Sequence, residues 1–148
     1  MSSPSDMVID QSDNVYVTGV THFGDNDSKD WVTIKYDSIG NEQWVIRYNG
    51  SGNSQDQSTS IATDSFGDVY VTGFSWDSAT GFDYTTIKYS AEGDELWIAK
   101  YDGPINGGDK ASDIFVDANN DVFITGTSAG SGTFGDFATV KYKGKVPF

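Results

Sequence analysis

Apolar and polar residues alternate along most of this chain, in short runs separated by turn-forming residues. In the run at 30–36, Ile34 and Tyr36 point to one face of an extended strand, because strand side chains alternate between faces. Trp31 and Lys35 point to the other face, so both faces carry large side chains. This pattern is typical of a small sheet that packs between two neighbouring sheets.

The same run occurs three times, at 30–36, 83–89 and 136–142, and both steps between copies are 53 residues. Each copy reads Asp-aromatic-x-Thr-aliphatic-Lys-Tyr. A fixed period of this length is typical of an array of supersecondary units, in which each unit buries its apolar face against the next. The repeat therefore predicts the architecture before any single residue does.

Each unit is predicted to contain four antiparallel strands joined by turns rich in Asp, Asn and Gly. The third strands are the three runs described above, and the third unit ends soon after its own, so its fourth strand is missing or degenerate. The remaining predicted strands lie at 6–10, 60–64 and 113–117 (first), at 15–19, 69–73 and 122–126 (second), and at 43–48 and 96–101 (fourth).

Four-stranded antiparallel units of this length, repeated around an axis, form a β-propeller. A linear stack or one large sandwich is the alternative, but the up-and-down strand order and the strict period favour the propeller. We predict an all-β fold of β-propeller blades, namely three four-stranded antiparallel units with the last incomplete. A single array is expected to span 1–148, with blade 1 at about 6–48, blade 2 at about 59–101 and partial blade 3 at about 112–143.

The repeating unit also resembles a known family. Asp-x-x-x-Asn/Asp-Val-Tyr-Val-Thr-Gly is followed by Asp-Tyr-x-Thr-Ile-Lys-Tyr, and then by Trp and Tyr before a Gly-rich loop. From Met7 to Tyr142 this pattern resembles the bacterial SBBP repeat, named for a seven-bladed β-propeller. The resemblance implies a propeller and, commonly, an extracellular or cell-surface bacterial protein without a defined biochemical role.

Three units are fewer than a complete propeller ring needs. We expect the ring to be closed by oligomerisation, with a homodimer favoured because two-fold assemblies are the commonest, or by the remaining blades of a larger protein. The exposed strand edges of a three-blade arc would promote such pairing.

The charge balance narrows the range of partners. The chain has 22 acidic and 9 basic residues, a net charge of −13, so its field repels phosphate backbones and anionic lipids. We expect no nucleic-acid partner and no membrane insertion, since no apolar run approaches the length that crosses a bilayer. Residues 1–6 lack the basic and apolar regions of a secretory signal, so the signal of an exported protein is expected to lie outside this chain.

Enzyme signatures are largely absent. The single histidine, His22, excludes sites built from several histidines, and nothing singles out a carboxylate pair for glycoside hydrolysis. An active site is needed once, whereas the acids and lysines of the third strands recur in every unit, so we expect these to be structural. They are Asp30, Asp83 and Asp136, and Lys35, Lys88 and Lys141. We expect no catalytic residue and no enzyme activity.

Connection lengths point to one functional end of the units. The long predicted connections are at 22–29, 76–82 and 129–135, with links at 49–58 and 102–111. Loops on a rigid scaffold often carry binding residues, and aromatic side chains on them suit a sugar or a peptide. The alternative is that these aromatic residues cap the ends of the inter-blade core, since single exposed aromatic residues are ordinary. The predicted ligand-binding residues are Phe23, Asp25, Asp27, Trp76, Asp77, Phe82 and Phe134.

The acids of the first long connection form a weak candidate metal site. Asp25, Asp27 and Asp30 are spaced like oxygen ligands of Ca²⁺, but they lack the full calcium-loop pattern with its distal Glu. A solvated turn is the alternative, so we expect no cofactor, with Ca²⁺ as the one ion to test.

The leading functional hypothesis is a non-catalytic scaffold or recognition module. It would self-associate and bind a protein or glycan ligand through the long-loop face. A lectin-like carbohydrate-binding module is the first alternative, and a fragment of a larger propeller enzyme is the second.

Overall fold

The computed structural model describes residues 2–22, 29–51 and 54–143, without the side chains at 133 and 134. Every regular element in these ranges is a β-strand. No described helix is long and apolar enough to cross a membrane. The all-β prediction is therefore confirmed.

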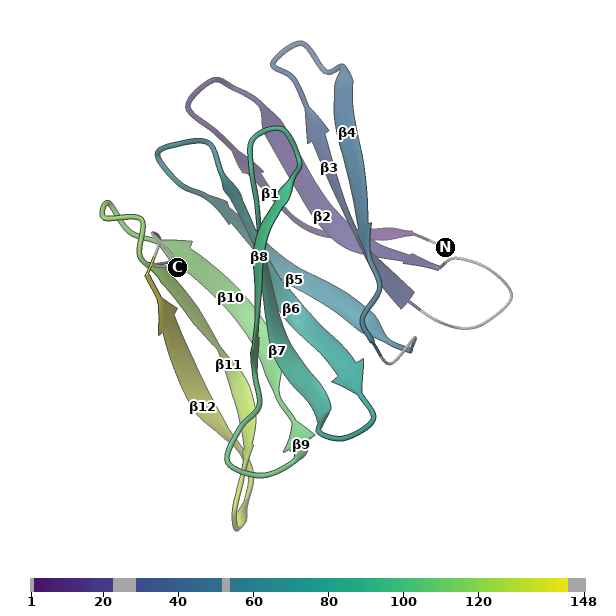
Figure 1. The fold of residues 1–148 in the computed structure, drawn as a ribbon, viewed down its shortest axis with the longest axis vertical. Helices are drawn as coiled ribbons and strands as arrows, with labels where there is room; N and C mark the ends of the chain where they lie inside the picture. Colours follow the sequence, from purple (N-terminus) through teal and green to yellow (C-terminus); the bar gives the residue numbers. More distant parts are fainter. Residues whose placement is uncertain (1, 23–28, 52–53, 144–148) are drawn as a thin grey trace.

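The strands form three separate antiparallel sheets, which fan side by side (Figure 1). Blade 1 contains β1 (Ser3–Ile9), β2 (Val15–His22), β3 (Lys29–Tyr36) and β4 (Glu42–Tyr48) in that order. Blade 2 contains β5 (Asp56–Thr63), β6 (Val69–Asp77), β7 (Gly81–Tyr89) and β8 (Glu95–Tyr101), and the short β9 (Gly107–Gly108) pairs parallel to β7. Blade 3 contains β10 (Lys110–Val116), β11 (Val122–Gly130) and β12 (Thr133–Tyr142). The prediction of two four-stranded units followed by a shorter third is confirmed.

Two apolar cores lie between neighbouring sheets, as the two-faced strands require. In the first core, Tyr16 and Trp31 of blade 1 pack against aliphatic side chains of blade 2 such as Ile61 and Ile87. The second core repeats this arrangement, with Tyr70, Tyr84 and Trp97 of blade 2 facing blade 3. Each inner sheet face is therefore covered by the next sheet, which is the defining packing of a repeat array.

The first strands β1, β5 and β10 lie next to one another along the inner side of the fan (Figure 1). A hydroxyl group links all three: Ser60 Oγ lies 2.8 Å from Asp6 Oδ2 and 3.1 Å from Asp113 Oδ1. In addition, the backbone N–H of Ile61 donates to Asp6 Oδ2 at 3.1 Å. The inner strands are therefore held in register by polar contacts as well as by the cores.

The first strand of each blade begins three or four residues earlier than predicted. Each contains a bulge, located at Pro4/Asp6 in β1, Ser58/Ser60 in β5 and Ala111/Asp113 in β10. A bulge inserts one residue and shifts the alternation of side chains, so a simple two-residue period misses the earlier half of the strand. A glycine lies opposite each bulge, and at Gly73 an added Cβ would lie 2.0 Å from the carbonyl oxygen of Gln57. This close approach explains the glycine that ends every Val-Tyr-Val-Thr-Gly run.

Two of the predicted long connections are short hairpins. Only residues 78–80 separate β6 from β7, and only 131–132 separate β11 from β12. The strands continue past the predicted ends because the turns are tight: the Ala79 N–H donates to Asp77 Oδ1 at 2.9 Å, and Gly81 adopts φ 94°. The prediction that long loops surround Trp76 and Phe134 is therefore wrong. Most of the connection at 22–29 lies outside the described residues.

Candidate functional site

An aromatic cluster stands at the β6–β7 hairpin of blade 2 and consists of Phe74, Trp76 and Phe82. Trp76 and Phe82 are opposite each other in the strand register, and their ring centroids are 5.0 Å apart at an edge-to-face angle of 76°. Phe74 lies 5.3 Å from the same Phe82 ring at 85°. Edge-to-face packing is favourable for aromatic rings, so the three side chains form one preorganised surface.

A lysine from the next blade completes this cluster. The Lys110 ammonium lies 4.9 Å from the Phe74 ring centroid and 4.7 Å from that of Phe82. A cation over an aromatic face within about 6 Å is attracted by the ring electrons. Trp76, which packs against the same Phe82 ring, stays partly exposed to solvent.

An open recess of about 440 Å³ adjoins the cluster. Its lining combines the Trp76 and Phe82 rings with polar groups of Thr80 and Asn106 and with the glycines of β9. The Asn106 side-chain amide donates to the Ala79 carbonyl at 2.9 Å, which holds the linker against the hairpin. An aromatic wall with nearby hydroxyl and amide groups can bind the apolar face and the hydroxyls of a sugar, or a peptide side chain.

The structure brings some of the predicted binding residues together and leaves others outside the described part of the chain. Trp76 and Phe82 meet, and Asp77 follows them in β6, where Asp77 Oδ2 accepts a hydrogen bond from Ser51 Oγ at 3.1 Å. The Ala79 N–H that Asp77 binds holds the pKa of its carboxyl below the ordinary value. Three others lie outside the described residues, namely Phe23, Asp25 and Asp27.

The remaining predicted residues fall on strands. Phe134 belongs to β12, but its side chain lies outside the described set. Asp30 is buried at the beginning of β3. Phe74 and Lys110 were not among the predicted binding residues. Phe74 could have been found from its two-residue spacing to Trp76, which places both on one face of a strand, whereas Lys110 comes from another blade and had no local signal.

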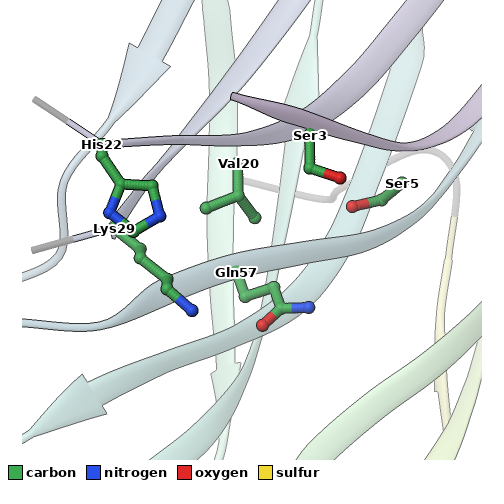
Figure 2. A pocket seen from close by; sticks show the side chains of 6 residues that line it. All are labelled: Ser3, Ser5, Val20, His22, Lys29 and Gln57. Carbon is green, nitrogen blue, oxygen red and sulfur yellow. The ribbon is translucent and has the colours of Figure 1, made fainter. Parts of the chain in front are cut away.

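The histidine occupies a different place, a recess of about 240 Å³ between blade 1 and β5 of blade 2 (Figure 2). Figure 2 shows His22 and Lys29 at one end of this recess and the hydroxyls of Ser3 and Ser5 across from them. None of the described residues that line it is a carboxylate. A Ser-His-Asp arrangement is therefore not assembled by these lining residues.

The repeated lysines have structural partners. Lys88 is buried, with its Nζ 2.7 Å from Asp68 Oδ2 and 3.3 Å from Asp64 Oδ2. Burial lowers the pKa of Lys88. Hydrogen bonds to Asp68 and Tyr70, together with nearby negative charge, raise the pKa by more than burial lowers it, so the net shift is upward. Lys35 donates instead to the Ala91 carbonyl at 2.8 Å. These lysines hold turns and neighbouring blades in place.

Residues 43–78 match a family model described as SBBP, a beta-propeller repeat. These residues are an SBBP repeat. The match runs from β4 of blade 1 to β6 of blade 2, so the repeat motif is offset from the sheets it builds. The sheets outside the matched residues repeat the same up-and-down strand order, and the third-strand runs recur at a step of 53 residues.

A relative with a descriptive name supports the same architecture. The chain is 33% identical over 111 residues to an uncharacterized WD repeat-containing protein of Acanthamoeba polyphaga mimivirus. The matched region is 64% of this chain and spans 8% of the length of that relative. WD repeats build four-stranded propeller blades, which are sheets of the same kind as the four-stranded units of this chain.

Proposed function

We propose that this chain is a non-catalytic β-propeller scaffold and recognition module, whose two open faces are covered by a second copy of the chain. The observation that carries this proposal is a difference between equivalent positions. Phe137 of blade 3 is 93% exposed, whereas Trp31 and Tyr84, at the same place in blades 1 and 2, are 1% and 2% exposed. The outer face of blade 3 therefore carries a side chain of the kind that is buried in blades 1 and 2, but no described sheet packs against it.

The opposite end of the array has the same property. Met7 of β1 is 55% exposed, whereas Ile61 and Ile114, at the equivalent register of β5 and β10, are 5% and 7% exposed. Two shallow apolar recesses mark the end faces, one of about 180 Å³ on blade 1 and one of about 240 Å³ on blade 3. Both ends of the array thus carry side chains that the inner blades bury.

The two end faces are complementary in kind. At both internal junctions an aromatic face of one blade meets an aliphatic face of the next. Blade 3 ends on an aromatic face with Phe115, Phe123 and Phe137, and blade 1 begins on an aliphatic face with Val17 and Ile34. Blade 3 of one copy therefore suits blade 1 of another, and two such contacts close a ring of two copies.

Solution mass by size-exclusion chromatography with light scattering tests this proposal. We expect the wild-type chain at about 100 μM to have twice the mass of one chain, given two contacts of this kind. Phe137→Asp places a charge in the contact and should yield single chains. Phe66→Asp is the matched control, because Phe66 is equally an exposed aromatic residue but lies in the β5–β6 turn. A wild-type chain that stays single would remove the second copy from the proposal.

A second candidate function, a lectin-like carbohydrate-binding module in an extracellular or cell-surface setting, is favoured by the aromatic cluster and its recess. We expect Trp76→Ala to abolish binding on a glycan array, because it removes the exposed ring on which a sugar would stack. Phe66→Ala, which removes an exposed ring elsewhere, should leave the signal unchanged. An array without signal for the wild-type chain would reject the lectin, and peptides would then be the ligands to test at the same cluster.

A further inference from the structure

Three carboxylates converge where blade 2 meets blade 3. Asp83 lies in β7, Asp102 directly follows β8, and Asp109 directly precedes β10. One oxygen from each side chain lies within 4.8 Å of the other two. Three like charges at this distance repel one another strongly unless a cation lies between them.

The backbone holds these groups in place. The linker after β8 crosses the beginning of β7, where β9 pairs with Gly81 and Phe82 and the Asp109 N–H donates to the Phe82 carbonyl at 2.7 Å. Asp109 itself is fully buried and accepts hydrogen bonds from the N–H groups of Gly103 at 2.8 Å and Ala129 at 3.0 Å. The cluster is therefore part of the junction and not a chance meeting of surface side chains.

A buried carboxylate oxygen and a buried hydroxyl near this cluster have no partner in the described structure. Asp83 is 4% exposed, and its Oδ1 accepts no hydrogen bond, although Thr80 Oγ1 donates to its Oδ2 at 2.7 Å. Ser128 is also 4% exposed with an unpaired hydroxyl. Buried polar atoms are normally satisfied, so each such atom calls for an explanation such as an ion.

The Ser128 hydroxyl points at the cluster. A Cβ placed on Gly103 would lie 2.2 Å from Ser128 Oγ and 2.7 Å from Asp109 Oδ1, so both oxygens face the same small space. Ser128 is also the residue opposite Asp109 when the β10–β11 register is continued by one pair. A neutral oxygen ligand therefore stands beside the three carboxylates.

We propose that Asp83, Asp102 and Asp109, with the Ser128 hydroxyl beside them, bind one Ca²⁺ ion. Ca²⁺ takes oxygen ligands at about 2.3–2.6 Å, so two of its ligands can lie up to about 5 Å apart, whereas the Mg²⁺ limit is near 4.2 Å. The three carboxylate oxygens all lie within 4.8 Å of one another, which is inside the span that one Ca²⁺ ion can bridge. The bound ion joins the beginning of β7 to both ends of the linker, and it fastens blade 3 to blade 2.

The surrounding charges are consistent with a cation here. Burial raises the pKa of the Asp83 carboxyl, and the negative charge of Asp102 adds to the rise, whereas Lys100 opposes it. Lys100 also lies 4.0 Å from Asp77 Oδ2, so its charge is shared with another carboxylate. A divalent cation among the three acids would offset the repulsion between them that Lys100 does not neutralise.

The junction between blades 1 and 2 provides an internal comparison. The residues 53 positions earlier are Asp30, Asn49, Asp56 and Ser75. The acid that follows the fourth strand is thus an amide at the first junction, which leaves one negative charge fewer for an ion. Asp102→Asn gives the second junction the residue set of the first, and it changes an exposed side chain that the fold does not bury.

Calorimetric titration of the chain with CaCl₂, together with its thermal unfolding, tests the site. We expect one Ca²⁺ per chain and a melting temperature about 5 °C higher at saturation, because an ion that binds only the folded state stabilises it. Asp102→Asn should weaken the binding at least about tenfold through the lost charge. Asp94→Asn removes the same charge from an exposed turn and should bind like the wild type.

Asp83→Asn gives an independent readout. It should abolish the Ca²⁺ response while leaving the calcium-free chain folded with an unchanged or higher melting temperature, because it removes one of three carboxylates that repel one another at close range. Absence of heat and of a melting shift at millimolar CaCl₂ would overturn the proposal. So would unchanged binding by Asp102→Asn, or an equal response to MgCl₂.

Discussion

Asp64→Ala is expected to lower the free energy of unfolding by about 3–5 kcal/mol, because it breaks a buried ion pair from one side only. The Lys88 ammonium would keep Asp68 but lose the partner at 3.3 Å, in a site that is almost closed to water. The buried Tyr70 hydroxyl, which donates to Asp64 Oδ2 at 2.9 Å, would lose this acceptor. The turn after β5 would also lose its main acceptor.

Asp10→Ala is the matched control for this prediction. Asp10 occupies the same place in blade 1 and caps the same kind of turn, accepting the Ser12 N–H at 2.8 Å. Its lysine counterpart, Lys35, donates to Ala91 of the next blade and does not need this carboxylate. We expect a loss of only about 1–2 kcal/mol. Equal losses for the two variants in urea denaturation would show that the turn, and not the ion pair, sets the cost.

The arrangement of strands could be predicted from the sequence because the same strand pattern occurs three times. The run 83–89 has large side chains on both faces, and both faces are buried only when another sheet packs on each side. The difference between Ile61 and Met7 in burial follows from the same reasoning, since only the inner blades have two neighbours.

The features that were missed depend on irregularities or on contacts distant in sequence. The bulge at Ser58/Ser60 and the tight hairpin at 78–80 lengthen their strands beyond the predicted ends. Regular alternation of apolar and polar residues predicts only the middle of such strands. Lys110 reaches Phe82 from the next blade, which no local pattern encodes. The meeting of Asp102 and Asp109 with Asp83 likewise requires the path of the linker across β7, which becomes visible only in three dimensions.

Ile87→Ala is expected to cost about 3–4 kcal/mol of unfolding free energy, because Ile87 is fully buried in the core between blades 1 and 2. Chemical denaturation monitored by tryptophan fluorescence measures this loss. The cavity would open in the centre of the array, where the sheets on both sides limit relaxation. A loss below about 1 kcal/mol would contradict the sandwiched position of blade 2.

Ile34→Ala separates the stability of one chain from that of the assembly. Ile34 holds the position of Ile87 in blade 1, but it lines the open recess of the end face and is only half-buried. In a single chain we expect a cost of about 1 kcal/mol, since little apolar area is lost from a covered core. If a second copy covers this face, the loss of unfolding free energy caused by Ile34→Ala depends on protein concentration. At concentrations where the assembly is populated, the loss approaches that of Ile87→Ala. A small cost at every concentration would instead mean that blade 1 keeps its outer face in water.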